Sequence, residues 1–263
     1  MERGPKSRGF GVAAGLDPDV AGPLAERCAE LGYGSVWSND HPGALGLETL
    51  RAFAAAAPGL ELGVAVMPLD RHEPPAIAEH VRRLGLDRER LWLGVGAGFS
   101  DRPLSTMRHA LPALREALPG VRIILAAMGP KMSALAGAQY DGAFFNWMTP
   151  AFAARARGNV ERGAGESGRT PPPVFGYVRT AVGADAAERL AKEESFYRDL
   201  HAGYRNQFAR LGEPVGAVGV AAGEAEEAQR ELVAYEALDV VVVRGLASAT
   251  IEAMTALAEA AAP

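Results

Sequence analysis

Short apolar runs alternate with longer stretches of helical periodicity along the whole chain. Eight runs rich in β-branched or aromatic residues, each bounded by Gly, Pro or Asp, predict strands at residues 9–14, 35–38, 60–66, 91–95, 121–126, 142–146, 173–181 and 240–243. Apolar residues at helical spacing predict helices at residues 18–31, 45–57, 75–84, 104–118, 130–137, 150–163, 184–211, 224–236 and 248–261. Asp17-Pro18 and Thr149-Pro150 each place a capping side chain before a proline, as is typical of helix starts.

The order of these elements predicts the fold class. Runs such as Val240-Val-Val-Val243 are continuously apolar, which is typical of strands buried on both faces of a parallel sheet. Eight strand–helix units in 263 residues predict an α/β fold, a (β/α)8 TIM barrel formed by a single domain over residues 1–263. The alternative, an open doubly wound sheet, needs a nucleotide fingerprint at its first turn. The segment Gly9-Phe-Gly11-Val-Ala-Ala14 matches that fingerprint only formally, because its glycines lie inside the first strand.

Composition narrows the kind of partner. The net charge is −5 and acids and bases are interspersed, so there is no basic stripe for a nucleic acid and a small molecule is the expected ligand. No apolar run approaches the roughly 20 residues that cross a bilayer. Residues 1–8 lack the apolar region of a secretion signal, so we expect no membrane partner and a cytoplasmic location. Cys28 is the single cysteine, which excludes an internal disulfide and a cysteine-based zinc site, and no metal is expected.

Candidate chemistry is sought where the strands end, because the active site of a TIM barrel forms there. The second strand ends in Val36-Trp37-Ser38-Asn39-Asp40-His41, which puts an aromatic ring, a carboxylate and an imidazole at the expected mouth. A histidine there can transfer a proton near neutral pH. In the third strand, small residues Gly63 and Ala65 permit a flat ring to lie close to the main chain.

Three further strand ends offer contacts for a ligand. Gly94, Gly96 and Gly98 leave space and bare amides after the fourth strand. The fifth strand runs into Gly129-Pro130 and a helix start, where backbone N–H groups suit a phosphate. After the sixth strand, Asn146 can hydrogen-bond a heterocycle and Trp147 can wall a pocket. Each feature also has a structural explanation, as a loop cap, a tight turn or core packing.

Together these strand ends predict a planar, phosphate-bearing cofactor. Its ring would lie against the exit of the third strand, with its phosphate at the fifth helix and a histidine over the ring. No activated nucleophile or metal cluster accompanies this arrangement, which therefore favours flavin-type hydride chemistry over hydrolysis.

Several segments, taken in order, resemble the bacterial luciferase-like superfamily. They are most similar to the branch that uses the deazaflavin coenzyme F420. The resemblance implies a (β/α)8 barrel, usually a homodimer, that binds F420 or FMN. The matching segments are 25–41 (AERCAELGYGSVWSNDH), 67–78 (MPLDRHEPPAIA), 93–98 (LGVGAG), 126–132 (AAMGPKM) and 141–150 (DGAFFNWMTP).

The resemblance also implies roles for individual residues. His41 matches the position that assists proton transfer over the ring, Asp40 matches a neighbouring ligand contact, and residues 64–67 match a backbone bulge, often with a non-prolyl cis peptide, that supports the middle ring. Residues 127–130 match the phosphate-binding turn. The expected site residues are thus His41 and Asp40 for catalysis, Val64, Ala65, Val66, Met67, Gly96, Ala127, Met128, Gly129, Pro130 and Asn146 for the cofactor, and Trp37, Asp101 and Trp147 for the substrate pocket.

Two departures from the family pattern keep alternatives open. F420-dependent dehydrogenases often carry an acidic glutamate after the fourth strand, where this chain has Phe99-Ser100-Asp101, and the usual long insertion before the fifth strand is absent. Only three lysines and abundant alanine indicate a GC-rich genome, which suits actinobacteria, where F420 is common. The leading hypothesis is an F420-dependent oxidoreductase that transfers a hydride to or from a small organic substrate. The alternatives are an FMN-dependent monooxygenase and a non-catalytic cofactor-binding or partner barrel.

Overall fold

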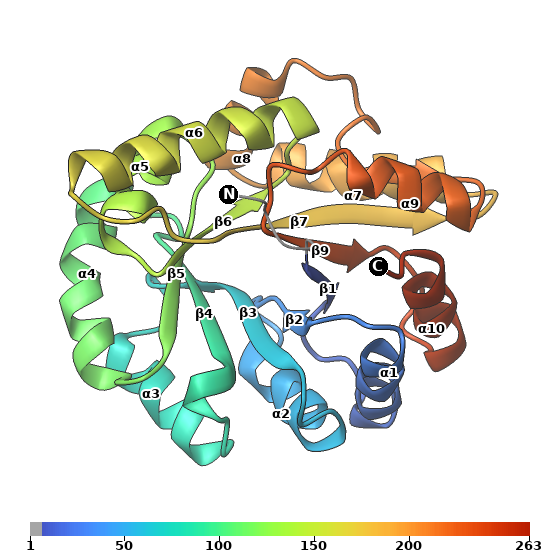
Figure 1. The fold of residues 1–263 in the computed structure, drawn as a ribbon, viewed down its shortest axis with the longest axis horizontal. Helices are drawn as coiled ribbons and strands as arrows, with labels where there is room; N and C mark the ends of the chain where they lie inside the picture. The colour runs from blue at the N-terminus through green and yellow to red at the C-terminus, as the bar shows by residue number, and fades with distance from the viewer. Residues whose placement is uncertain (1–6) are drawn as a thin grey trace.

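The eight apolar runs form eight parallel strands that close into one barrel, as the sequence predicts (Figure 1). The computed structural model describes residues 7–263; residues 1–6, the start of the segment in which no secretion signal is expected, lie outside the described residues. The ring closes because β9 pairs with both β1 and β7 while β7 also pairs with β6. The barrel strands are β1 (Ser7–Val12), β2 (Ser35–Ser38), β3 (Glu61–Pro68), β4 (Leu91–Gly96), β5 (Arg122–Ala126), β6 (Gly142–Asn146), β7 (Val174–Val182) and β9 (Val240–Gly245).

Helices surround the strands in Figure 1, and several of them begin in the same way. Five helices that follow barrel strands, α1, α3, α4, α5 and α6, have proline in the first turn, where its missing N–H leaves no hydrogen bond unmade. The helices are α1 (Pro18–Glu30), α2 (Gly46–Ala56), α3 (Pro74–Arg83), α4 (Pro103–Ala117), α5 (Pro130–Gln139), α6 (Pro150–Glu166), α7 (Ala186–Leu200), α8 (Ala202–Leu211), α9 (Ala225–Val233) and α10 (Ile251–Ala260), with a 3-10 turn at Arg88–Arg90.

The inside of the barrel is filled mainly by aromatic rings. Trp37 lies at its centre, fully buried, with ring centroids 5.2 Å from Phe144 and 5.4 Å from Phe175. Gly63 makes room for the indole, because a Cβ at that position would lie 2.1 Å from a ring carbon of Trp37. The interior is therefore a packed core rather than a channel.

The end of the barrel where the strands begin carries a polar cluster. Glu61 accepts hydrogen bonds from the Trp92 indole (2.9 Å) and from Arg122, whose guanidinium also stacks on the Trp92 ring at 4.1 Å from its centroid. All three residues lie at strand starts. This cluster covers part of the end where the strands begin, and the expected site lies at the opposite end, where the strands finish.

The connection between β7 and β9 is longer than one helix. Residues 184–211 are predicted as one helical tract, but the structure divides them into α7 and α8 at His201, whose extended backbone interrupts the helix. A short strand that the sequence analysis missed, β8 (Val220–Ala222), pairs with the last three residues of β7. Buried Glu194 holds the loop before β8 by accepting the N–H groups of Gly216 and Val218.

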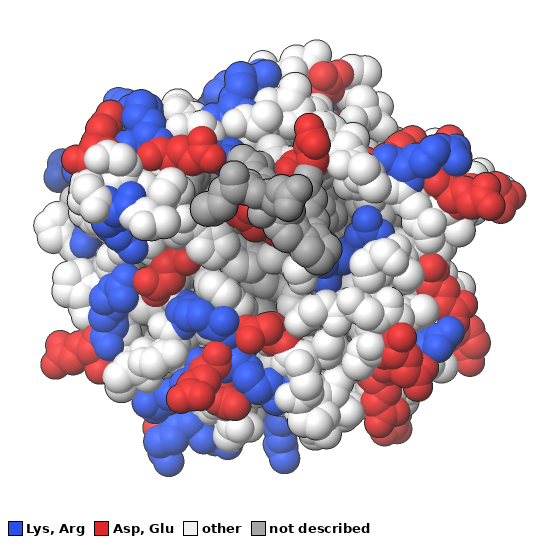
Figure 2. Space-filling view, viewed as in Figure 1, with Lys and Arg blue, Asp and Glu red and all other residues white. Residues whose placement is uncertain are grey.

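The α4–β5 connection, the helices and the surface charge can each be compared with the sequence analysis. α4 ends at Ala117 and β5 begins at Arg122, so the long insertion is absent from this connection. In the part of the chain that the structure describes, no helix has the length and apolar character needed to span a bilayer. Figure 2 shows acidic and basic side chains interspersed over the visible face, in agreement with the expected lack of a basic stripe there.

Candidate functional site

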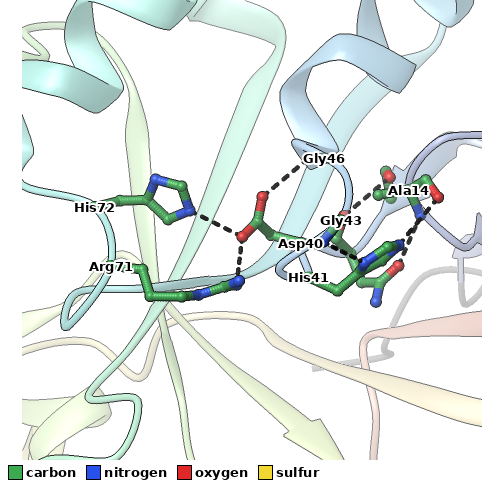
Figure 3. A network of polar contacts seen from close by, with 9 residues as sticks. Ala14, Asp40, His41, Gly43, Gly46, Arg71 and His72 are labelled. Carbon is green, nitrogen blue, oxygen red and sulfur yellow. Dashed lines mark hydrogen bonds and ion pairs between the residues drawn. The ribbon is translucent and has the colours of Figure 1, made fainter.

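The strand ends gather most of the expected site residues at one mouth of the barrel. The loop after β2 carries Asp40 and His41, and it lies beside the β1–α1 loop and the β3–α3 loop (Figure 3). The parallel register of β1, β2 and β3 brings these three loops together.

Asp40 is held by the loop that follows β3. Its carboxylate accepts hydrogen bonds from Arg71 (2.6 Å), from His72 (2.9 Å) and from the Gly46 N–H at the start of α2 (3.1 Å), and its side chain is 1% exposed. Figure 3 shows both basic side chains directed at this carboxylate. Asp40 therefore fixes the β2–α2 loop against the β3–α3 loop, and Arg71 and His72 are partners that sequence reasoning did not assign.

His41 is turned away from this network toward the first strand (Figure 3). Its Nδ1 accepts the Gly43 N–H (3.1 Å), so the neutral ring carries its proton on Nε2, which lies 3.4 Å from the Ala14 carbonyl oxygen. The residue is exposed at the mouth. An exposed imidazole with a defined Nε2–H can donate a hydrogen bond to a ligand in the mouth.

The exit of β3 contains the irregularity expected from the family resemblance. Its register against β4 shifts between Ala65 and Met67, and the Ala65–Val66 peptide is cis. Ala65 and Val66 pack with the residues inside the barrel, whereas Val64 and Met67 are fully buried in the outer core under the helices. Of the four expected residues, Ala65 lies in the inner core at 2% exposure, and only Val66, which is half-buried, has a partly accessible side chain.

The β5 exit forms the expected turn into α5. Gly129 is the residue before the helix, its extended backbone has φ −138°, and no side chain caps the helix. A Cβ at Gly129 would meet nothing within 4 Å, so the space in front of the helix is open. Ala127 is buried, whereas Met128 is half-buried and its carbonyl accepts a hydrogen bond from Arg210 of α8 (2.9 Å). The N–H groups of the first turn lack a side-chain acceptor and can receive an anion.

The side-chain amide of Asn146, at the end of β6, already makes hydrogen bonds within the protein. Its Oδ1 accepts a hydrogen bond from Arg179, and its Nδ2 lies 3.5 Å from the hydroxyl of Tyr204, whose pKa is raised by burial. Arg179 stacks on the Trp147 ring, 4.4 Å from its centroid. The polar cluster of Asn146, Arg179 and Tyr204 was not expected; the signal that could have found it is an arginine inside the otherwise apolar β7.

The three residues expected to line a substrate pocket lie in different environments. Trp37 is in the barrel core and does not reach the mouth, because its position on the pleat directs it inward. Trp147 is 1% exposed and packs under α7 and α8 against Phe208 and Leu190, so it is a core residue with a backbone φ of 51°. Only Asp101 is exposed, in the loop before α4.

The fold and the strand ends together define a structural class of protein. It is a parallel (β/α)8 barrel in which a histidine, a bulged third strand and an uncapped helix start surround one opening. Comparison with known proteins narrows this class. The sequence model described as luciferase-like monooxygenase matches residues 102–261, more than half of the chain. The protein belongs to the luciferase-like monooxygenase family, as the sequence resemblance indicates.

Solved structures confirm the barrel type. An F420-dependent secondary alcohol dehydrogenase in complex with an F420-acetone adduct is similar with a TM-score of 0.76 at 17% identity, covering 97% of this chain and 99% of that one. The coenzyme F420 dependent tetrahydromethanopterin reductase from Methanopyrus kandleri gives 0.71 at 16% identity, covering 97% and 96%. The oxygenating constituent of 3,6-diketocamphane monooxygenase from Pseudomonas putida, in complex with FMN, gives 0.64 at 14% identity, covering 98% of both chains.

Proposed function

We propose that the protein is an F420-dependent oxidoreductase that transfers a hydride between the deazaflavin and a small organic substrate. The observation that carries the proposal is the juxtaposition of the bulged β3 exit, a wall of small residues and an uncapped helix start around one opening. When bound, such a cofactor supplies hydride transfer, and the chain supplies binding, orientation and a proton.

The residues present fit a flat ring that bears a phosphate. Val66, Gly96 and Ala126 lie on three adjacent strands, and a Cβ at Gly96 would lie 2.8 Å from the Val66 side chain and 3.6 Å from the Ala126 Cβ. A Cβ at Gly96 would thus clash with Val66, so this strand contributes bare main chain to the wall. The open helix start at Gly129 follows the same strand as Ala126 and suits the phosphate.

The roles of the polar residues follow from their hydrogen bonds. His41 presents Nε2–H at the mouth and is assigned to proton transfer with the substrate, for which the ring must first release the Gly43 N–H from Nδ1, its one basic nitrogen. Asp40 is assigned a positioning role, because all its described partners hold the loop that bears His41. The two F420-dependent structures have higher TM-scores than the FMN complex, which supports F420 as the first cofactor to test.

The test is a parallel fluorescence titration of the purified protein with F420 and FMN. Ala126→Phe places a ring in the proposed space, and Ala113→Phe, on an exposed position of α4, is the matched control. We expect micromolar F420 binding to the parent and the control, and at least about tenfold weaker binding to Ala126→Phe, since lost ring packing is worth more than about 1.4 kcal/mol. Equal binding to both variants would place the cofactor elsewhere.

An FMN-dependent monooxygenase is the second candidate, supported by the family description and by the FMN-bound relative. F420 and FMN share a tricyclic ring and a phosphate, so the same mouth suits either. Tighter FMN than F420 binding, with oxygen consumption on addition of reduced FMN, would establish this alternative. Failure of both cofactors to bind would favour a non-catalytic barrel.

A further inference from the structure

Two buried arginines stand side by side on the inner wall of the barrel at the mouth. Arg179 of β7 and Arg244 of β9 are direct partners in the parallel register, and each follows by two residues an inward-facing residue, Tyr177 and Val242. Because residues two apart share a face of a strand, both arginines point into the barrel, one layer above the aromatic core. Gly11, the partner of Arg244 on β1, is covered by the Tyr177 ring, because a Cβ there would lie 2.8 Å from a ring carbon.

Neither arginine has an acidic partner. Arg179 is 3% exposed and Arg244 is 7% exposed, yet no carboxylate of residues 7–263 lies within the 4.0 Å that defines an ion pair with either. Arg179 bonds Asn146 and stacks on Trp147, and its Nε has no hydrogen-bond partner. The one hydrogen bond that Arg244 makes with a described residue goes to the neighbouring Gly245 carbonyl (3.2 Å). Burial of a cation without a counterion is unfavourable.

Arg244 faces a cavity of about 260 Å³. This volume equals that of roughly nine liquid waters at ~30 Å³ each, enough for a small organic acid. Small residues of the β1–α1 loop, including Ala14, form one side, and the Ala14 carbonyl is the group that lies against His41 Nε2. The cavity therefore adjoins the residue assigned to proton transfer.

One acidic residue, Glu193 of α7, also lines this cavity. Burial, and then the charge of Arg179, lower the pKa of Arg244 by more than Glu193 raises it. Glu193 thus lines the cavity without forming an ion pair with either arginine in the described chain.

We propose that Arg244, with the adjoining charge of Arg179, binds the oxyanion of the substrate, and that the substrate is a small organic molecule bearing a carboxylate. The identification of this ligand as a substrate rests on the proposed function, whereas the binding of a carboxylate by the arginines does not. The cofactor phosphate could supply the same kind of oxyanion, and the experiment below separates the two sources.

The experiment measures binding of acetate to the cofactor-free protein by thermal shift and calorimetry at constant ionic strength, with acetamide as the neutral probe. Arg244→Met is the test variant. Arg179 is left in place because it stacks on aromatic rings, so that replacing it would also disturb the core packing. Arg108→Met, which removes an exposed charge from α4, is the control. We expect saturable stabilisation by acetate, no effect of acetamide, and at least about tenfold weaker acetate binding to Arg244→Met, as expected for the loss of a charged hydrogen bond. Without acetate, Arg244→Met should melt at or above the parent temperature.

A second arm titrates the same proteins with F420 and FMN. We expect Arg244→Met to bind the cofactor as tightly as the parent, and we expect acetate not to compete with the cofactor. If acetate competes and Arg244→Met binds the cofactor more weakly, the arginines hold the cofactor phosphate and the proposal is overturned. Glu193→Gln should tighten acetate binding by removing a negative charge from the cavity. No acetate binding, combined with a destabilised Glu193→Gln, would show instead that Glu193 is the counterion. Acetate binding without cofactor binding would contradict the proposed function alone.

Discussion

Gly129→Asp should stabilise the fold while weakening cofactor binding. Gly129 precedes α5 with φ −138° and ψ 162°, which any residue can adopt, and a Cβ there meets nothing within 4 Å. An aspartate at this position can accept an N–H of the first turn and favourably oppose the helix dipole. These two effects are worth about 0.5–1 kcal/mol, or about 1–3 °C in melting temperature for a chain of this size.

The same carboxylate would repel a phosphate at the helix start. Two like charges ~4 Å apart repel by about 4 kcal/mol at an effective dielectric constant of ~20, and salt reduces this value. We therefore expect cofactor affinity to fall at least about tenfold, which corresponds to about 1.4 kcal/mol. Gly129→Asn, which caps without charge, should raise the melting temperature with a smaller loss of affinity.

Differential scanning calorimetry and fluorescence titration of the three proteins measure both effects. A Gly129→Asp variant that melts higher and binds F420 or FMN as tightly as the parent would refute the placement of the phosphate at α5. A lower melting temperature would refute the capping argument itself.

Four other predictions follow from single side chains. His41→Ala should lower turnover by about 10²–10⁴-fold, with a much smaller change in cofactor affinity, in steady-state assays paired with titrations; an unchanged turnover would remove the residue from the mechanism. Asp40→Asn should lower the free energy of unfolding by about 1–3 kcal/mol in urea titrations, because the buried carboxylate that Arg71 contacts loses its charge. Burial raises the pKa of Cys28 to about 12, so its thiol should resist Ellman's reagent at pH 8 in the native protein and react after unfolding. Burial, and then the charge of Arg205, lower the pKa of His201 below 6.5, so the unfolded chain binds a proton more readily and stability should fall as the pH drops below 6.5. His201→Asn should flatten this part of the stability–pH profile. An unchanged slope would mean that other groups cause the pH dependence.

The barrel could be predicted from the sequence because each strand is specified locally. Continuous apolar runs such as Val240-Val-Val-Val243 need cover on both faces, and only a parallel arrangement with surrounding helices provides it. Strand positions followed from these runs to within a few residues. The division of residues 184–211 at His201 was not predicted, because the cap of α8 is the His201 ring, which accepts the Gly203 N–H, and histidine is not a usual capping residue.

The positions of the candidate site residues could be predicted from chain order, but the directions of their side chains could not. The loops that follow strands are set by chain order, so Asp40 and His41 were expected at the mouth. The direction of a side chain on its strand depends on the pleat and on the register between strands, which placed Trp37 in the core. The pairing of Arg179 with Arg244 depends on the closure of the ring between strands about 65 residues apart.

The prolines at the helix starts have a consequence for how this mouth can change over evolution. They restrict the loops after β1, β3, β4, β5 and β6, and each such restriction removes about 0.4–1 kcal/mol of conformational freedom from the unfolded chain. The helices after β7, β8 and β9 have no proline in their first turn. Proline thus restricts every loop from β1 to β6 except the one after β2, whose helix α2 begins without it. The loops beside Arg179 and Arg244 carry no such restriction, so this sector can accept sequence variation, and new ligands with it, more readily than the rest of the rim.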